Sequence, residues 1–373
     1  MKESLISIRN NILKFHYKNI AKPIFFKIPP EIVHDHTTNL GKKLGSNSLT
    51  RSLTSNLFNY KNKKLEQKIL GIHFKNPIGL AAGFDKDAQL TDILPSVGFG
   101  FEEIGSITGE QCHGNPKPRL WRLINSKSLV VYYGLKNQGC QKIAKRIKNK
   151  SFKIPILISI AKTNSKSTVL TKNGITDYTK AYKEFANIGD ASVINISCPN
   201  TFGGEPFHDT KKLDQLLKKL KEVHSTKPLF IKISPDLNEK ELDNIITVAR
   251  KYKIAGFICT NLSKNRQNIK LQDNVIHTKG GISGKPIENK SNKIISFIYK
   301  KTKGEFIIIG VGGVDSAKSA YKKICLGASL VQLITGMIYE GPQLISEINQ
   351  GLVKLLEKDG LKNISEAIGK DSN

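Results

Sequence analysis

Cysteine is scarce in this 373-residue chain, which contains only Cys112, Cys140, Cys198, Cys259 and Cys325 and no C-x-x-C pair. Disulfide frameworks and zinc clusters need paired or grouped cysteines, so this spacing argues against both and favours a reducing compartment. No apolar run reaches the ~18 residues that can cross a bilayer, and the N-terminus lacks the apolar core of a secretory signal. We therefore expect neither a transmembrane span nor a metal site.

Acidic residues are also scarce, since 31 Asp and Glu stand against 59 Lys and Arg, giving a formal net charge of +28. One interpretation is an anionic partner, either nucleic acid or an acidic membrane. The other is a solvated, lysine-rich surface. We favour the second because the lysines are spread along the chain and no aromatic residues interleave them as a stacking platform requires. We expect no nucleic-acid partner.

Residues 1–65 differ in pattern from the rest of the chain. They are basic, contain short helical patterns, and carry a small apolar patch, Ile24-Phe25-Phe26, beside Lys22 and Lys27. Residues 31–45 follow a Pro-Pro pair and precede a break near Gly45, which predicts a helix. We expect 1–65 to form a small helical extension and 66–373 to form the main domain.

From about residue 76 the pattern alternates between short apolar strands and helices. The strands are expected at residues 78–82, 99–105, 155–161, 192–197, 228–233, 254–260, 306–311 and 329–334. The helices are expected near 87–97, 137–149, 176–188, 211–223, 237–252, 287–301, 315–326 and 341–357. Eight such units predict an α/β fold, a closed (β/α)8 TIM barrel. An open, doubly wound sheet is the alternative. Residues 67–75 look like a hairpin that could close the bottom of the barrel.

Polar residues and glycines follow the ends of the expected strands, where barrel enzymes place their chemistry. After the last two strands, Gly312-Gly313 and Thr335-Gly336 offer bare backbone N–H groups at turns leading into helices, a common phosphate site. Tight turns alone are the alternative reading of these glycines. Lys86 and Lys232 lie at two further strand ends, and an inward lysine there is costly unless it faces an anion. A reduced flavin offers such an anion at N1 and O2; a surface salt bridge is the alternative.

The segment Asn195-Ile196-Ser197-Cys198-Pro199-Asn200 places two amides and a thiol at the end of the fourth strand. Amide side chains can read the alternating donors and acceptors of a planar amide or imide ligand. A thiol acts as a general base when its pKa is lowered. A lone buried cysteine is usually inert, and the other four are interpreted in that way. Cys198, between amides on the barrel rim, is the candidate base.

Five motifs, in order along the chain, resemble the dihydroorotate dehydrogenase family. They are 81–87 (AAGFDKD), 194–201 (INISCPNT), 231–236 (IKISPD), 280–284 (GGISG) and 309–316 (IGVGGVDS). The similarity runs from about residue 20 to 355. It implies an FMN-binding barrel that oxidises dihydroorotate to orotate in pyrimidine synthesis.

The resemblance also implies a role for individual residues. FMN would be held by Ala82, Gly83, Lys86, Ser106, Asn195, Lys232, Thr260, Gly284, Gly312, Gly313, Thr335 and Gly336. The substrate would be held by Lys86, Asn195, Asn200 and Asn261. Cys198 would take the C5 proton while a hydride leaves C6 for flavin N5.

The N-terminal segment resembles the helical extension of the membrane-associated, quinone-reducing class of the family. The matching features are residues 22–26, Pro30-Glu31, His34 and His36. This resemblance implies a quinone as electron acceptor and peripheral contact with a membrane through residues 1–65. Apolar side chains would enter the bilayer surface and lysines would face anionic headgroups. We expect the protein on the cytoplasmic side of the membrane or in the cytoplasm.

The chain departs from the family pattern at several site positions. The quinone class normally has serine as its base, whereas this chain has Cys198, as the soluble classes do. A substrate-reading asparagine aligns with Val131, and a hydroxyl residue expected after Asn261 is Leu262. An asparagine expected near FMN aligns with Ser159. An unpaired polar ligand group costs ~1–3 kcal/mol, so either the substrate differs or neighbours compensate. The candidate neighbours are Tyr132, Lys136, Asn137 and Ser263.

Three functions therefore remain open from the sequence. The first is a dihydroorotate dehydrogenase with a quinone acceptor. The second is a soluble-type relative that uses fumarate or another acceptor, or acts on a different dihydropyrimidine. The third, suggested by the lost asparagine and the high charge, is a flavin-binding protein without turnover.

Overall fold

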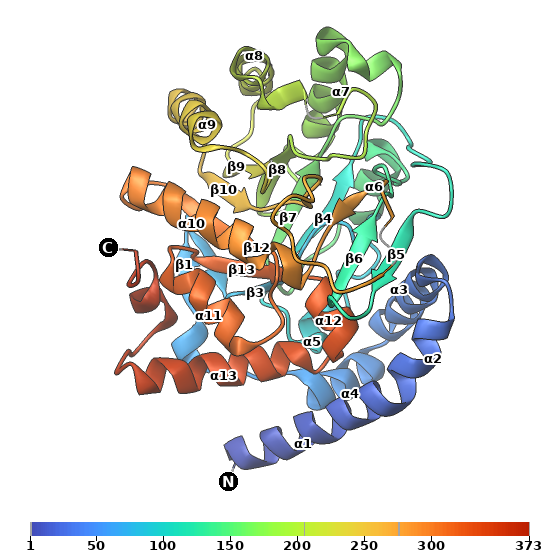
Figure 1. Ribbon diagram of the computed structural model, residues 1–373, viewed down its shortest axis with the longest axis vertical. Helices are drawn as coiled ribbons and strands as arrows, with labels where there is room; N and C mark the ends of the chain where they lie inside the picture. The colour runs from blue at the N-terminus through green and yellow to red at the C-terminus, as the bar shows by residue number, and fades with distance from the viewer. Residues whose placement is uncertain (1, 205, 275–276, 373) are drawn as a thin grey trace.

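A computed structural model describes residues 2–204, 206–274 and 277–372, and its centre is a closed barrel of eight parallel strands (Figure 1). In chain order these are β3 (Ile78–Leu80), β4 (Phe101–Ile107), β7 (Ile156–Ile160), β8 (Ala191–Asn195), β9 (Leu229–Ile233), β10 (Gly256–Cys259), β12 (Ile307–Val311) and β13 (Leu330–Leu333). Every predicted strand is present, and β13 pairs with β3 to close the ring. The barrel is confirmed and the open sheet is wrong.

The barrel strands form because their runs of isoleucine, valine and leucine suit a strand buried on both faces. Helices surround them in Figure 1, namely α6 (Cys140–Ile147), α7 (Thr171–Glu184), α8 (Thr210–Lys221), α9 (Glu239–Lys251), α10 (Glu288–Thr302), α11 (Ala317–Cys325), α12 (Thr335–Glu340) and α13 (Leu344–Lys358). The longer of these helices have a buried apolar stripe, as Leu213, Leu216 and Leu220 of α8 show. Short 3-10 turns, η3 to η6, lie at Ser167–Val169, Pro206–His208, Lys285–Ile287 and Ile364–Ala367.

The first predicted helix, 87–97, is largely wrong. Only α5 (Leu94–Val97) is helical, and Gly98 ends it with a φ of 102°. The carboxylate of Asp85 accepts hydrogen bonds from the backbone N–H groups of Gln89 and Leu90, at 2.8 and 2.6 Å. This side chain holds the segment as a turn and competes with helix formation.

The bottom of the barrel is closed by the predicted hairpin, β1 (Gln67–Ile69) paired with β2 (Ile72–Phe74). Phe74 packs edge-on against Phe101 of β4, with ring centroids 5.5 Å apart. Both belong to a buried cluster with side chains of the barrel strands. The hairpin therefore seals the end of the barrel away from the predicted site.

A small antiparallel sheet, which the sequence analysis did not predict, lies among the loops beyond the barrel strands. It consists of β5 (Leu120–Leu123), β6 (Ser128–Val131) and β11 (Gly281–Ile282). Gly281 of β11 pairs with Val131 of β6. Two loops that leave different strands are thereby joined over one part of the rim.

The N-terminal segment forms α1 (Lys2–His16), the π-turn η1 (Tyr17–Ala21), α2 (Lys22–Lys27), α3 (Pro30–Ser46), α4 (Ser48–Phe58) and the turn η2 (Lys63–Leu65). The helix predicted at 31–45 is confirmed as α3. In Figure 1, α1 runs along α13, while α2 and α3 lie beside β5.

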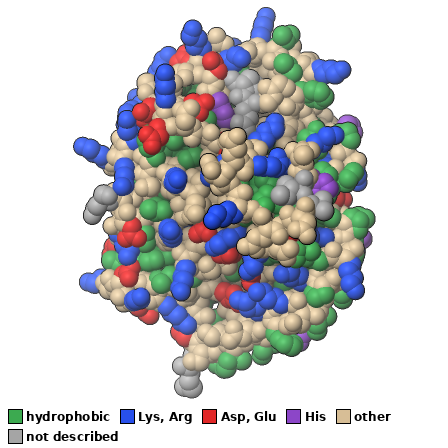
Figure 2. All heavy atoms as spheres, in the orientation of Figure 1, with side chains coloured by type: hydrophobic (Ala, Val, Ile, Leu, Met, Phe, Trp, Pro, Cys, Tyr) green, Lys and Arg blue, Asp and Glu red, His purple; other side chains and the backbone are tan. Residues whose placement is uncertain are grey.

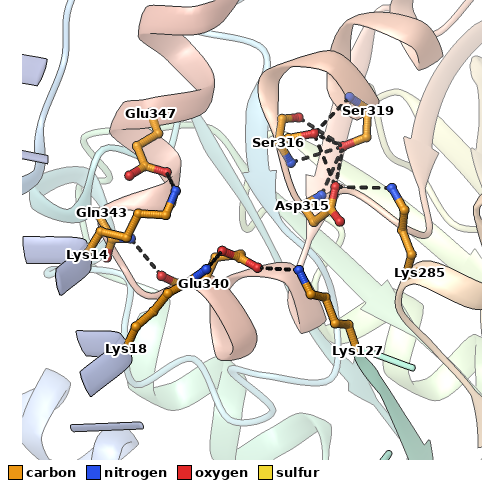
Figure 3. Close-up of polar contacts among 10 residues, drawn as sticks. All are labelled: Lys14, Lys18, Lys127, Lys285, Asp315, Ser316, Ser319, Glu340, Gln343 and Glu347. Atoms are coloured by element: carbon orange, nitrogen blue, oxygen red, sulfur yellow. Dashed lines mark hydrogen bonds and ion pairs between the residues drawn. The ribbon is translucent and has the colours of Figure 1, made fainter. Parts of the chain in front are cut away.

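Ion pairs fix this extension to the barrel domain (Figure 3). Lys14 pairs with Glu347 at 3.0 Å, and Lys18 pairs with Glu340 at 2.5 Å. Glu340 also accepts from Lys127 at 3.0 Å. Although burial opposes ionisation of Glu340, these two lysines keep its pKa below the ordinary value. The extension is therefore attached at α12 and α13, next to the last barrel strand.

The basic charge is spread over the surface rather than gathered. Figure 2 shows Lys and Arg side chains scattered across the visible face, with acidic side chains among them. Within the described residues, no helix is long and apolar enough to cross a membrane. The same part of the chain holds no cluster of three or more His, Cys, Asp or Glu that could bind a metal.

Candidate active site

One cavity of about 510 Å³ opens at the carboxyl ends of the barrel strands. Every residue that the sequence assigned to the site lines it: Ala82, Gly83, Lys86, Ser106, Asn195, Cys198, Asn200, Lys232, Thr260, Asn261, Gly284, Gly312, Gly313, Thr335 and Gly336. These residues come from seven of the barrel strands and the loops that follow them. The structure thus brings the whole predicted set together, while the role of each residue stays a prediction.

A chain of hydrogen bonds fixes the amides on the cavity floor. Asn195 Nδ2 donates to Ser106 Oγ at 2.8 Å, and Ser106 Oγ lies 2.8 Å from Ser159 Oγ. Asn261 Nδ2 donates to Asn195 Oδ1 at 3.2 Å and to Ser197 Oγ at 3.0 Å. Side chains held in this way are preorganised for a planar ligand with alternating donors and acceptors. Ser159, where the family pattern expects asparagine, is part of this support.

Lys232 and Glu103 form a buried ion pair beside these amides. Lys232 Nζ lies 2.8 Å from Glu103 Oε2, and the two side chains are 5% and 0% exposed. The N–H of Ala82 donates to the same carboxylate oxygen at 3.3 Å. The sequence analysis weighed a surface salt bridge against an inward lysine. The structure shows an inward lysine whose partner is a buried carboxylate.

Cys198 and Asn200 sit on the loop after β8. Asn200 Nδ2 donates to the backbone oxygen of Val131 at 2.8 Å, and Asn115 Nδ2 donates to the backbone oxygen of Asn200 at 3.0 Å. Asn200 Oδ1 is buried without a hydrogen-bond partner among the described residues. Cys198 is partly exposed, whereas Cys112, Cys140, Cys259 and Cys325 are buried. The thiol that faces the cavity is therefore the predicted one.

The cavity wall also has the features that a flavin mononucleotide needs. Both amide atoms of the fully buried Gln332, on β13, lack a partner among the described residues, and Gln332 lines the cavity. Buried amides are normally paired, so these atoms point to a polar ligand. A Cβ on Gly336 would lie 2.0 Å from the backbone oxygen of Val314, and one on Gly313 would lie 2.3 Å from the Cβ of Glu288. Glycine is required at both turns, and the residues present fit the cofactor.

The two glycine turns that the sequence predicts to bind phosphate differ in how they connect to the helices that follow them. Thr335 is the first residue of α12, as the sequence predicted. By contrast α11 begins at Ala317, and its cap is Ser316, whose hydroxyl accepts from the N–H of Ser319 at 3.3 Å. Figure 3 shows Asp315 between this cap and Lys285. An anion bound at Gly312-Gly313, as predicted, would therefore contact loop N–H groups rather than the start of α11.

Lys86 lies where the extension meets the barrel rim. Its Nζ is 3.2 Å from His34 Nε2 and 4.1 Å from the ring centroid of Tyr133. Burial, together with the charge of Lys136, lowers the pKa of Lys86 to about 8. Burial and Lys86 likewise lower the pKa of His34. An anionic ligand beside Lys86 would offset the cost of keeping it charged.

Val131 and Leu262 both line the cavity, so the family's two polar groups are absent at these positions. Of the proposed compensating neighbours, Lys136 lines the cavity. Asn137 is hydrogen-bonded to Thr108 at 2.8 Å. Ser263 donates to Asp236 at 2.6 Å and is fully buried, and Tyr132 is not among the lining residues. The structure leaves Lys136 as the one candidate of the four that reaches the ligand space.

The sequence analysis assigned no residue of the extension to the cavity itself. Residues of η1, α2 and α3 line it: Tyr17, Phe25, Phe26, Pro30, Val33, His34, Thr37 and Leu40. Tyr17 Oη donates to the backbone oxygen of Ile338 at 2.7 Å, which joins the extension to the last barrel unit. The clustering of Phe25, Phe26 and His34 near two prolines was visible in the sequence, but their position over the barrel was not. Gln332 and Glu103 were missed because the sequence does not show whether a polar residue in a strand is buried or exposed.

The fold and cavity define a (β/α)8-barrel enzyme with its polar groups at the carboxyl-terminal rim. The family model described as dihydroorotate dehydrogenase matches residues 64–356. The chain belongs to the dihydroorotate dehydrogenase family, which confirms the resemblance.

Relatives at full length support the same assignment. A protein of Trichodesmium erythraeum named dihydroorotate dehydrogenase (quinone) is 39% identical over 95% of this chain and 98% of its own. A protein of Haloarcula marismortui with the same name is 36% identical over 95% of this chain and 99% of its own. The crystal structure of the Eimeria tenella enzyme in complex with ferulenol superposes with a TM-score of 0.83 at 29% identity, covering 92% of this chain and 96% of that one. The ligand-free Eimeria enzyme gives 0.82 at 30% identity, with coverages of 92% and 99%.

Proposed function

We propose that this protein is a quinone-dependent dihydroorotate dehydrogenase that uses FMN to oxidise dihydroorotate to orotate in pyrimidine synthesis. The observation that carries the proposal is that all the predicted flavin and substrate residues line one cavity, which continues between α2 and α3. The name that the curated relatives share, dihydroorotate dehydrogenase (quinone), supports the choice of acceptor.

The side chains divide the work at the reacting end of the cavity. FMN, when bound, supplies the acceptor for the hydride that leaves substrate C6. Cys198 takes the proton from substrate C5, and in doing so its thiolate becomes a thiol. Asn195, Asn200 and Asn261 orient the substrate ring, because their amides are fixed by the hydrogen bonds described above. Lys86 binds an anionic group of the substrate.

The quinone would approach through the outer part of the cavity. Phe25, Phe26, Val33 and Leu40 give that part an apolar wall suited to a hydrophobic ring and tail. In this scheme residues 1–65 form the membrane and quinone-access extension, and residues 66–373 form the catalytic domain. Val131 and Leu262 favour, as a second candidate, oxidation of a less polar dihydropyrimidine at the same site.

The acceptor and the substrate can be assigned in one assay series. We expect the flavin-loaded protein to oxidise dihydroorotate with a short-chain ubiquinone or menaquinone, and much more slowly with fumarate. Faster turnover with fumarate would overturn the quinone assignment, and turnover with another dihydropyrimidine alone would favour the second candidate.

The affinity for orotate should fall as the pH rises through about 8. The pKa of Lys86 is lowered to about 8, so the lysine is charged below that pH and neutral above it. A neutral Lys86 no longer attracts the carboxylate, and the apparent Kd should rise about tenfold between pH 7 and pH 9. The measurement is a flavin difference titration with orotate across that range. Lys86→Met should bind weakly at every pH; a flat profile in the unaltered protein would contradict the role of Lys86.

We propose further that the extension contacts a membrane peripherally. Most of the large hydrophobic side chains exposed in the described chain lie on the N-terminal helices, and Leu5, Ile8, Ile12 and Phe15 follow helical spacing along α1. Such a stripe enters the boundary between headgroups and acyl chains, and nearby lysines favour anionic lipids. The site of action would be the cytoplasmic face of a membrane.

Membrane contact is testable by sedimentation with vesicles. We expect the protein to bind vesicles that contain phosphatidylglycerol, and Ile8→Glu with Ile12→Glu to reduce binding at least tenfold, because charges replace the centre of the stripe. The control is Leu170→Glu in the barrel domain, where the leucine is 66% exposed against 55% for Ile8 and 52% for Ile12. Equal loss in the control, or none in the double variant, would contradict the assignment of this face.

A further inference from the structure

A buried lysine that the mechanism above does not use lies behind the catalytic loop. Lys162 follows β7, and its residue is only 3% exposed. Its Nζ donates to the backbone oxygen of Phe202 at 2.7 Å, four residues beyond Cys198 on the same loop. Keeping an ammonium out of water is costly unless a nearby negative charge compensates. Its position therefore calls for a physical explanation.

Lys162 and Cys198 share a small cavity separate from the main one. This cavity, of about 10 Å³, is lined by both residues and by Leu135, Tyr178, Asn195 and Thr201, among others. A space of that size holds about one water molecule. Cys198 thus has one side toward the ligand cavity and the other toward the lysine.

Among the residues that the structure describes, the other charged and titratable groups nearby are already engaged. Asp177 accepts from the N–H and the hydroxyl of Thr163, each at 2.7 Å, and from the N–H of Gly109 at 3.3 Å. Lys232 is paired with Glu103. Tyr178 Oη donates to the backbone oxygen of Asn195 at 2.7 Å. Lys86 packs against Tyr133 and His34.

Burial lowers the pKa of Lys162. The negative charges of Cys198 and, to a smaller extent, Asp177 act in the opposite direction and raise it. The two groups therefore act on each other electrostatically in this arrangement. By reciprocity, a lysine that is stabilised by a thiolate stabilises that thiolate equally.

We propose that Lys162 is a positioning residue that keeps Cys198 in the ionised, proton-accepting form and holds its loop in place through Phe202. The proposal deepens the proposed function and rests on it, because Cys198 is the base of that reaction. Because the intrinsic pKa of a serine hydroxyl is much higher, the same lysine would leave a much smaller fraction of a serine ionised. A cysteine at this position is therefore ionised to a greater extent by the buried charge of Lys162.

The test is the pH dependence of Cys198 alkylation by iodoacetamide in the flavin-loaded protein. Only Cys198 is partly exposed among the cysteines, so mass spectrometry of its peptide gives a rate for this thiol. In Lys162→Met the pH midpoint of alkylation should rise by about 1–3 units. The pH midpoint of the rate of flavin reduction by dihydroorotate should rise by a similar amount. Lys162→Arg should bring both pH midpoints back toward those of the unaltered protein.

Asn164→Ala is the matched control for the loop. It removes the hydrogen bond between Asn164 Oδ1 and the N–H of Phe202, at 2.8 Å, without removing charge. Its alkylation midpoint should stay near that of the unaltered protein. An unchanged midpoint in Lys162→Met, or an equal rise in Asn164→Ala, would overturn the electrostatic role. Because alkylation needs no substrate, this result is independent of whether dihydroorotate is the substrate.

Discussion

Cys198→Ala should lower the rate of flavin reduction by dihydroorotate by about 10²–10⁴, the usual contribution of a positioned general base. Cys198 is the partly exposed cysteine of the catalytic loop and lines the cavity with the substrate amides. Removing the thiol removes the group that the proposed mechanism assigns to take the C5 proton. Rapid-mixing absorbance measurements at the flavin band under anaerobic conditions give the rate.

Three comparisons show whether the loss is specific to the Cys198 thiol. FMN content and orotate affinity should stay near normal in Cys198→Ala, because Asn195 and Asn261 are held by hydrogen bonds to Ser106 and to each other. Cys325→Ala, on α11, should reduce flavin at close to the unaltered rate. Cys198→Ser should keep measurable activity, since serine is the usual base of the quinone class. A Cys198→Ala protein with an unchanged rate would end the assignment of the base.

Lys232→Met should destabilise the protein by about 3–5 kcal/mol, because it leaves the carboxylate of Glu103 buried and unpaired. The pair is 2.8 Å long and nearly fully buried. The free energy of unfolding from urea titration, measured without added cofactor, is the appropriate quantity. FMN content should fall as well, since Lys232 lines the cavity.

Glu103→Gln combined with Lys232→Met should recover much of the lost stability, because no buried charge remains. Lys301→Met removes an exposed pair with Asp243, 3.0 Å long, and should change stability by less than about 1 kcal/mol. Equal effects of Lys232→Met and Lys301→Met would show that the buried pair is not the cause.

The barrel could be predicted because its strands are short, apolar and β-branched, and because eight of them alternate with amphipathic helices. The failures were places where a side-chain contact or pairing with a distant segment decides the structure. Residues 87–93 form a turn because the Asp85 side chain occupies their N–H groups. The strand Ser128–Val131 forms a local hairpin with Leu120–Leu123, which the sequence analysis overlooked. Its other edge pairs with Gly281–Ile282, about 150 residues away, which no local pattern reveals.

The floor of the site was predictable for a related reason. Strand ends in a barrel meet at one rim, so Asn195, Lys232 and Asn261 had to lie close together. The outer part of the cavity and its buried polar partners were not predictable. His34 reaches Lys86 only because α3 is packed across β5, and the orphaned amide of Gln332 is visible only once its surroundings are known. The resemblance supplied roles for the floor residues, whereas the geometry adds Lys162, Glu103 and Gln332.

The central claim is that this cavity couples dihydroorotate to a quinone through bound FMN. Anaerobic titration of the yellow protein with dihydroorotate tests it most directly. We predict bleaching of the flavin band with one equivalent of dihydroorotate per flavin, followed by full return of the colour when a short-chain quinone is added. A flavin band that dihydroorotate leaves unchanged, in protein that binds FMN stoichiometrically, would contradict the account.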